Sequence, residues 1–379
     1  MKKISLFIVF ICLSSMLWGQ DLLDLRQKAE AGNPDAQNEL GRAYLSGTKG
    51  FEKNYEEAVK WFSKAAKQNH AAAQCDLGLC YAKGNGVERD MTQAVYWWKK
   101  ASEQGEQQAQ FNLGVSYLNG EGVTKDMAQA AYWWTQAAEQ GHTGAQYDLA
   151  ICYEKGYGVP KDLNKAFLLY KQAAGQGDAG SQYSLGFCYY NGDGVTKDIV
   201  QAVYWWTQAA ENGDVDAQCR LARCYDKGEG VEADSKKAEY WYRKAAEQGE
   251  ILAQNHLGFS LYISSIGILE SMGNPDNYQP NIGKEAVYWF SKSANQGSDF
   301  GQWLLGDCYF RGIGVPKNYT QAVYWYRKAA EQGCDGAQTK LGNCYYEGLG
   351  VERNVSTARY WWRKAAEQGN AEAKEKLGL

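Results

Sequence analysis

The side chains best suited to chemistry are few in this chain of 379 residues. Ser46 and Lys49 form its only Ser-x-x-Lys match, a spacing in which a lysine assists a serine nucleophile in enzymes that react with β-lactams. The Ser-Asp-Asn and Lys-Thr-Gly phrases that accompany the motif in such enzymes are missing from the sequence. The three histidines, His70, His142 and His256, are too scattered to indicate a metal or acid–base site. We therefore expect no catalytic residue, no metal and no cofactor.

The phrase Gly-x-Gly-Val is a second candidate for chemistry, and it occurs seven times. A glycine-rich loop that binds phosphate is one interpretation, but such loops follow a β-strand, and no strand pattern precedes these copies. Glycine also ends helices, because it adopts positive φ without strain. The copies are therefore predicted to be turns that begin where helices end, at Gly84, Gly120, Gly156, Gly192, Gly228, Gly312 and Gly348.

The N-terminal residues have the pattern of a secretory signal peptide. Lys2 and Lys3 precede an apolar run from Ile4 to Leu17, and we expect cleavage to leave Gln20 as the first residue. The run is shorter than the roughly 20 residues that span a bilayer as a helix. The mature protein is therefore expected in the bacterial periplasm or outside the cell, without a transmembrane segment. A retained signal anchor is the alternative.

Most of the cysteines recur at one position of a repeated phrase. Equivalent positions in neighbouring helical repeats lie on the order of 8–10 Å apart. This exceeds the ~7 Å between Cα atoms that a disulfide tolerates. Although disulfides are usual in exported proteins, we predict that these cysteines are small buried residues without disulfides. Cys334 lies outside the repeated position and is a candidate free thiol. The six cysteines that each precede a tyrosine are Cys80, Cys152, Cys188, Cys224, Cys308 and Cys344.

A repeat organises almost the whole chain. The phrase Ala-Gln-x-x-Leu-Gly-x-x-Tyr returns every 36 residues over most of the sequence, in nine full copies. Each copy is predicted to contain two helices, A and B, separated by the glycine turn. In helix A, Ala73, Leu77 and Cys80 share one face, which indicates packing. In helix B, Trp97 and Trp98 fall on the same helical stripe as Ala94 and Ala101. This spacing favours a core position for both rings over an aromatic cage for a ligand.

These phrases, together with Ala-Glu-Gln-Gly at the end of each copy, resemble Sel1-like repeats over roughly residues 35 to 379. The resemblance implies an all-α, right-handed α/α superhelical solenoid, similar to tetratricopeptide arrays, of about nine two-helix repeats. It also implies a scaffold for protein complexes rather than a catalyst. Secreted cysteine-rich relatives join helix B to the next helix A by a disulfide, but the corresponding positions here, such as Ala66 and Gln74, are not cysteines.

The repeat pattern divides the chain into segments. Residues 1–19 are the predicted signal peptide, 20–34 a half-repeat cap, and 35–261 repeats 1–6 with the start of repeat 7. The seventh copy holds twelve more residues than the others, so 262–285 is predicted to be an inserted loop. Residues 286–369 complete repeat 7 and contain repeats 8 and 9, and 370–379 form a capping helix.

Two columns of aromatic and apolar residues are candidate binding surfaces. In an array of this family, positions equivalent to 75, 79 and 82 of helix A would face the concave side, where exposed aromatic residues commonly mark a partner site. Burial between neighbouring A helices is the alternative. A second column begins with Tyr96 and Tyr132 of helix B, for which packing between B helices and a sugar- or protein-binding ladder both remain open. The concave candidates are Phe111, Val115, Tyr147, Ile151, Tyr183, Phe187, Tyr190, Trp303 and Phe310.

The composition narrows the function without naming it. The net charge is only -4 and the hydrophobic content is 45%, so neither a nucleic-acid binder nor a disordered chain is expected. The favoured function is an exported, non-enzymatic scaffold that binds a protein or peptide in the concave groove. A cell-wall protein that binds peptidoglycan or another glycan is the alternative. Penicillin binding or β-lactam hydrolysis would rest on the Ser-x-x-Lys match alone.

Overall fold

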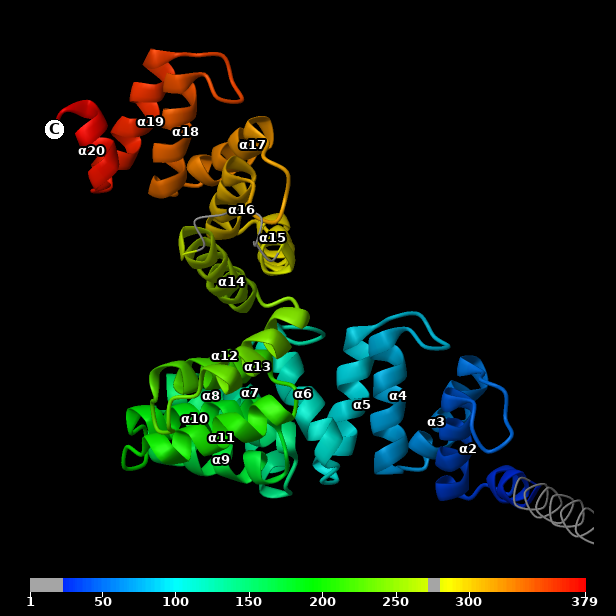
Figure 1. Cartoon of the computed structure of the whole chain (residues 1–379). Coiled ribbons are helices and arrows are strands. Elements are labelled where there is room, and N and C mark those ends of the chain that lie inside the picture. Colours follow the sequence, from blue (N-terminus) through cyan, green and yellow to red (C-terminus); the bar gives the residue numbers. More distant parts are fainter. Residues whose placement is uncertain (1–22, 272–279) are drawn as a thin grey trace, which may run out of the picture. The chain divides into compact units, whose positions relative to one another are not determined.

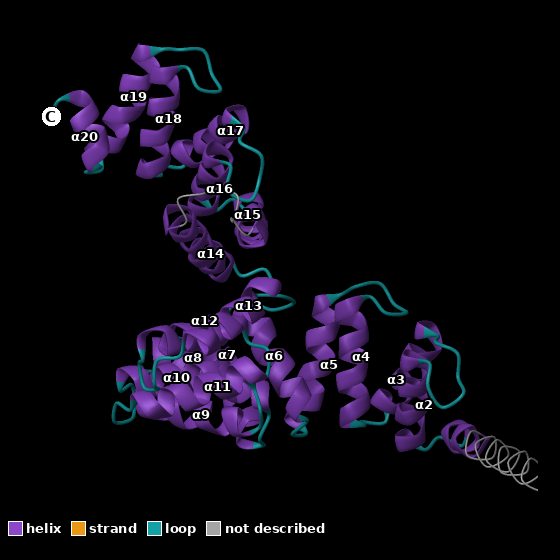
Figure 2. Cartoon of the chain, viewed as in Figure 1, coloured by secondary structure: helices purple, strands orange, loops and turns teal. Residues whose placement is uncertain are grey.

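The structure, a computed structural model, describes residues 23–271 and 280–379. Over these residues the regular structure is entirely α-helical, and loops connect the helices (Figure 1, Figure 2). The predicted signal peptide at residues 1–19 and residues 272–279 of the predicted insertion lie outside the described residues. Among the helices that are described, none combines the length and the hydropathy needed to cross a membrane.

The predicted alternation of A and B helices is confirmed. A short helix at residues 23–30 precedes the first repeat. The A helices are α2 (Pro34–Ser46), α4 (Ala71–Lys83), α6 (Gln107–Asn119), α8 (Thr143–Lys155), α10 (Ala179–Asn191), α12 (Val215–Lys227), α14 (Ile251–Ser271), α16 (Asp299–Arg311) and α18 (Asp335–Glu347). The B helices are α3 (Tyr55–Lys67), α5 (Met91–Glu103), α7 (Met127–Glu139), α9 (Leu163–Gly175), α11 (Ile199–Glu211), α13 (Ser235–Glu247), α15 (Pro280–Asn295), α17 (Tyr319–Glu331) and α19 (Val355–Glu367), followed by α20 (Ala371–Leu377).

The helices form two compact units, Met1–Lys197 and Asp198–Leu379. Within each unit, successive helices pack against one another, and each A helix that has the B helix of its repeat in the same unit makes its largest contact with that helix. The arrangement is that of a solenoid, in which each repeat buries its apolar faces against its neighbours.

Local capping fixes where each helix begins and ends. Asp126 precedes α7, and its carboxylate accepts hydrogen bonds from the backbone N–H groups of Ala128 and Gln129. Gly156 ends α8 in the left-handed region, with φ of 78°. Gly158, two residues further, also has a positive φ and lies against the carbonyl of Met127, so closely that a Cβ there would overlap it. The glycine turn is thus a helix end packed on the start of the preceding B helix.

Core clusters lie where a B helix meets the A helix of the next repeat, and consist of one large B-helix ring, small alanines and the A-helix leucine. Trp134 and Leu149 are 2% and 3% exposed, and both belong to one buried cluster. The prediction that both members of each aromatic pair are buried is right for Trp134 and wrong for Trp133, which is only half-buried. The reason is that Trp133 packs only against the edge of another cluster, which includes Trp98 of α5 and Leu113 of α6.

In most repeats a buried glutamine links the A helix to the end of the B helix of its own repeat and to the preceding repeat, and sequence analysis did not foresee it. Gln110 of α6 is buried, and its Nε2 donates to the carbonyl of Ser102 in α5 at 3.3 Å. Its Oε1 accepts from Nε2 of Gln140, which follows α7, at 2.8 Å. One amide therefore connects three helices. The same pairing recurs in Gln37/Gln68, Gln74/Gln104, Gln146/Gln176, Gln218/Gln248, Gln254/Gln296, Gln302/Gln332 and Gln338/Gln368.

Replacing Gln110 with leucine is expected to lower the free energy of unfolding by about 2 kcal/mol, because the variant loses both hydrogen bonds that the buried amide makes. Replacing Gln140 with leucine removes only the bond between the two glutamines. Because Gln140 is exposed, water can take its place as donor to Oε1 of Gln110, and the cost should be less than about 1 kcal/mol. Urea unfolding followed by circular dichroism compares the two variants. Equal losses would show that the buried amide is not a clamp between repeats.

The nine cysteines among the described residues are free thiols. The six that precede tyrosines are buried near the ends of A helices. Burial raises the pKa of Cys152 to about 11 and that of Cys188 to about 12. Cys334 is half-buried at the start of α18, and burial raises its pKa as well. These thiols are therefore protonated at neutral pH and function as small apolar residues.

The predicted loop at 262–285 is wrong over most of its length. Helix α14 continues to Ser271 and α15 begins at Pro280, so the additional residues lengthen two helices. The physical reason is that the glycine turn is missing. Gly84 ends α4, but the equivalent residue in the seventh repeat is Ser264, so the helix continues past this position. Tyr262 and Ile266 then pack against Phe290 and its neighbours.

Candidate partner-binding face

The nine predicted groove residues lie on A helices, in two separate groups. Seven belong to α6, α8 and α10 of the first unit, and Trp303 and Phe310 belong to α16 of the second. All nine side chains are half-buried, so the prediction that they are exposed is only partly right. Neighbouring helices cover part of each side chain, as the alternative interpretation proposed.

The first position of the column contacts the start of the next A helix. Phe111 of α6 stacks on His142 with ring centroids 4.5 Å apart. His142 precedes α8, and its Nδ1 accepts a hydrogen bond from the backbone N–H of Ala145 at 3.2 Å. Burial lowers the pKa of His142, which keeps the imidazole neutral at neutral pH. In the second unit, Asn255 and Ser298 form the equivalent contact at 3.0 Å. Residues at this position therefore help to stack the repeats.

Tyr183 and Phe187 border a cavity of about 240 Å³ between α8, α9 and α10. Their rings meet edge to face, with centroids 5.0 Å apart. Aromatic and aliphatic side chains form much of the wall, and Glu154, Asn191 and Asp193 supply polar atoms. The complete lining is Glu154, Leu163, Ala166, Tyr170, Tyr183, Ser184, Phe187, Cys188, Asn191 and Asp193.

The polar groups of this cavity are ordered by hydrogen bonds. Glu154 accepts from the hydroxyl of Tyr170 at 2.7 Å and pairs with Nζ of Lys155 at 2.6 Å. Burial opposes ionisation of Glu154, but the hydrogen bonds from Lys155 and Tyr170 outweigh it and lower the pKa of the carboxyl. Nδ2 of Asn191 donates to Asp193 at 3.0 Å. An ionised carboxylate beside aromatic rings can hold an apolar side chain together with a cation or an N–H donor.

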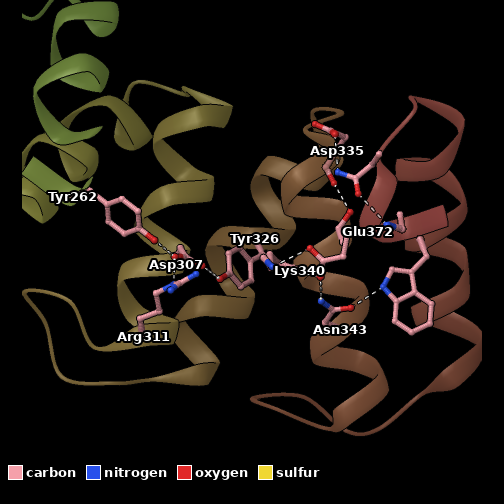
Figure 3. Close-up of polar contacts among 12 residues, drawn as sticks. Tyr262, Asp307, Arg311, Tyr326, Asp335, Lys340, Asn343 and Glu372 are labelled. Carbon is pink, nitrogen blue, oxygen red and sulfur yellow. Dashed lines mark hydrogen bonds and ion pairs between the residues drawn. The ribbon is translucent and has the colours of Figure 1, made fainter. Parts of the chain in front are cut away.

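In the second unit, an internal polar cluster occupies the corresponding face. Asp307 of α16 stands at the position of Phe187 and is buried. Its carboxylate accepts hydrogen bonds from Nε of Arg311 at 2.6 Å, from the hydroxyl of Tyr326 at 3.1 Å and from the hydroxyl of Tyr262 (Figure 3). The cluster joins α14, α16 and α17. Sequence analysis missed it, although an acidic residue at a position that is apolar in several copies was a visible signal.

A second polar network holds the C-terminal helix. Asn343 of α18 accepts from Nε1 of Trp362 at 3.0 Å and donates to Glu372 of α20 at 2.8 Å (Figure 3). Lys340 pairs with Glu372 at 3.2 Å. Ala373 of the same helix is buried against the core of the last repeat. These contacts hold α20 against the last repeat.

The Ser-x-x-Lys match does not form a nucleophile–base pair. Oγ of Ser46 donates to the carbonyl of Arg42 at 2.8 Å and also contacts Thr48. Lys49 pairs with Glu39 of α2. Each side chain has its own local partner. In the part of the chain that the structure describes, no cluster of three His, Cys, Asp or Glu residues could hold a metal ion.

The tyrosine column of the B helices is at the surface. Tyr96 is 47% exposed and Tyr132 is 53% exposed. Each ring rests edge to face on the tryptophan that follows it, with centroids 5.0 Å apart. These contacts favour a surface ladder over packing between adjacent B helices. The other half-exposed members are Tyr204, Tyr240, Tyr288, Tyr324 and Tyr360.

Comparison with known protein families finds nine repeats, the number predicted from the sequence. The Sel1 repeat matches nine successive segments: 34–70, 71–106, 107–142, 143–178, 179–214, 215–250, 251–298, 300–334 and 336–370. A search of curated proteins found no match.

Two solved structures are similar over most of the chain. One is a protective antigen of uropathogenic Escherichia coli strains with an SLR fold, at 37% identity and a TM-score of 0.76, covering 93% of this chain and 73% of the other. The second is a Sel1 repeat protein from Oxalobacter formigenes, at 31% identity and a TM-score of 0.53, covering 77% of this chain and 96% of the other. The chain therefore belongs to the Sel1 repeat family, a helical solenoid scaffold of the protein-interaction type.

Proposed function

We propose that the protein is an exported, non-enzymatic scaffold that binds a segment of a protein partner on the A-helix face of its first unit. The observation that carries this proposal is the cavity between α8 and α10, where Tyr183 and Phe187 stand beside the ionised Glu154. Its volume of about 240 Å³ is smaller than the roughly 300–1,000 Å³ of ordinary small-molecule sites. A single side chain of a larger partner fits such a cavity better than a metabolite does.

The surroundings of the cavity supply the rest of a peptide-binding surface. Phe111, Val115 and Ile151 on α6 and α8 are half-buried apolar residues that leave part of their surface accessible. Interfaces obtain much of their binding energy from one or two anchors in a pocket, while surrounding contacts exclude water. We place the anchor of the partner in this cavity, against Tyr183 and Phe187.

Affinity capture from envelope and culture-supernatant fractions tests the proposal, with residues 20–379 as bait. A Tyr183→Ala, Phe187→Ala variant should lose at least tenfold in affinity for a captured protein, because its anchor pocket is opened. A Tyr132→Ala variant, which alters a half-exposed residue of α7, is the matched control and should bind like the parent. Both variants must keep the parent's circular dichroism. Equal capture by the parent and the cavity variant would exclude this face.

Binding of a glycan is the competing function, because the half-exposed tyrosines of the B helices could stack on sugar rings. Retention of the parent on purified cell wall, reduced by Tyr132→Ala and unaffected by the cavity variant, would replace the present proposal. Export is tested by the intact mass of the protein in each fraction. A chain that begins at Gln20 outside the cytoplasm supports export, whereas an uncleaved cytoplasmic chain contradicts it.

A further inference from the structure

One repeat lacks the tryptophan that the others share. The first member of the B-helix aromatic pair is tryptophan in eight of the nine repeats and leucine in the fourth, at Leu169 of α9. The neighbouring position, where Tyr132 stands in α7, is Leu168 in the same repeat. Tryptophan occupies the equivalent place at Trp61, Trp97, Trp133, Trp205, Trp241, Trp289, Trp325 and Trp361.

The environment of this position is the same in the third and fourth repeats, which are both in the first unit. Trp133 packs against a buried cluster that includes Trp98 and Leu113. Leu169 packs against the equivalent cluster one repeat later, which includes Trp134 and Leu149. The surrounding side chains thus form a receptor for an indole, and in the fourth repeat the smaller side chain fills only part of it.

A cavity of about 390 Å³ lies at this place, between α7, α8 and α9. This volume is within the roughly 300–1,000 Å³ typical of ligand sites. It shares no residue with the cavity that Tyr183 and Phe187 border. Its lining is Thr135, Ala138, Glu139, Gly141, Gln146, Leu149, Tyr153, Lys165, Leu168, Leu169 and Gln172.

The lining combines an apolar floor with a polar rim. Leu149 and Ala138 are buried, whereas Leu168 is 56% exposed, so the cavity reaches the surface beside Leu168. Nζ of Lys165 lies 5.0 Å from the centre of the Tyr153 ring, at the side of the cavity. Thr135, Glu139 and Gln172 add hydrogen-bond donors and acceptors at the rim. Such a rim suits the amide groups on either side of a side chain in a polypeptide.

We propose that this cavity binds the indole side chain of a tryptophan from a partner polypeptide, as a second interaction site separate from the A-helix face. An indole is the expected ligand because the chain's own tryptophan side chains occupy the equivalent place in the other eight repeats. An unfilled apolar cavity forfeits the dispersion contacts that a ring would restore. A planar aromatic ring regains them at a site already shaped for it.

The full mature chain, residues 20–379, is titrated into N-acetyl-5-fluorotryptophanamide, and binding is followed by the broadening of the ligand's fluorine NMR signal. The parent should bind, and Leu169→Trp should bind at least tenfold more weakly because its own indole occupies the cavity. The Leu169→Trp variant should fold, since eight repeats carry the same residue. Absence of binding by the parent, or unchanged binding by Leu169→Trp, would overturn the proposal.

A converse variant and a second probe make the test independent of any single substitution. Trp133→Leu should create an equivalent cavity one repeat earlier and raise the number of bound ligands per chain from one to two. A number that stays at one in the folded variant would contradict the proposed receptor. If free 5-fluoroindole binds more tightly than the amide, the site belongs to a small molecule, and the assignment to a polypeptide is wrong.

Discussion

Replacement of Gly158 by alanine is expected to destabilise the protein by about 3–4 kcal/mol, against about 1 kcal/mol for the same change at Gly156. Both glycines have positive φ, of 69° and 78°, so both alanines suffer the cost of the left-handed region. Only at Gly158 would the new Cβ overlap backbone atoms, those of Met127 at the start of α7. At Gly156 the nearest side-chain atom would be Cβ of Lys161, at an ordinary distance of 3.5 Å.

Urea unfolding of the two variants, followed by circular dichroism, measures this difference directly. The comparison is internally controlled, because the residues are two positions apart in one turn and undergo the same substitution. The same contrast should appear at Gly192 and Gly194 in the next repeat, where Gly194 lies against Leu163. If Gly156→Ala and Gly158→Ala lower the stability equally, the close packing of the turn on the preceding B helix is wrong.

Replacement of Asp307 by leucine is expected to cost about 3 kcal/mol, because it removes the acceptor from the buried hydroxyls of Tyr262 and Tyr326. Burial raises the pKa of both tyrosines, so each remains a neutral donor that needs an acceptor. The side chain of Arg311 is 50% exposed and can return to water, so its loss of a partner adds little.

A compensating variant distinguishes the cost of leaving the two hydroxyls without an acceptor from the cost of altered packing in this cluster. When both partners of a buried hydrogen bond are replaced by apolar groups, the cost can nearly vanish. The triple variant Asp307→Leu, Tyr262→Phe, Tyr326→Phe should therefore recover most of the lost stability, to within about 1 kcal/mol of the parent. Urea unfolding of the single and triple variants decides the point. A triple variant that is less stable than Asp307→Leu would contradict the role given to the two hydroxyls.

The sequence predicted the helices well because their signals are local. The in-phase glycines, aspartates and alanines that begin, end and pack each helix act within a few residues of one another, as Asp126 and Gly156 illustrate. The insertion was misread because its length was compared with the other repeats. The more useful signal was the absence of a glycine at Ser264 to end the helix.

The candidate sites were less predictable because they depend on contacts between repeats. The half-burial of Phe111 follows from its stacking on His142, 31 positions further along the chain, which helical periodicity alone does not reveal. The link between Tyr262 and Asp307 spans 45 positions. Leu169 was recognisable as an outlier in its column, but the cavity beside it depends on the packing of three helices.

We propose above that the partner binds to the A helices of the first unit, at the cavity that Phe187 borders. The most direct test places the photo-crosslinking amino acid p-benzoylphenylalanine at Tyr183 in one sample and at Tyr132 in another, and irradiates each in intact cells. Position 183 borders the cavity on α10, and position 132 is on the half-exposed surface of α7. We predict a crosslinked protein partner from position 183 and none from position 132. A partner crosslinked from position 132 alone would place binding on the B helices and contradict the account.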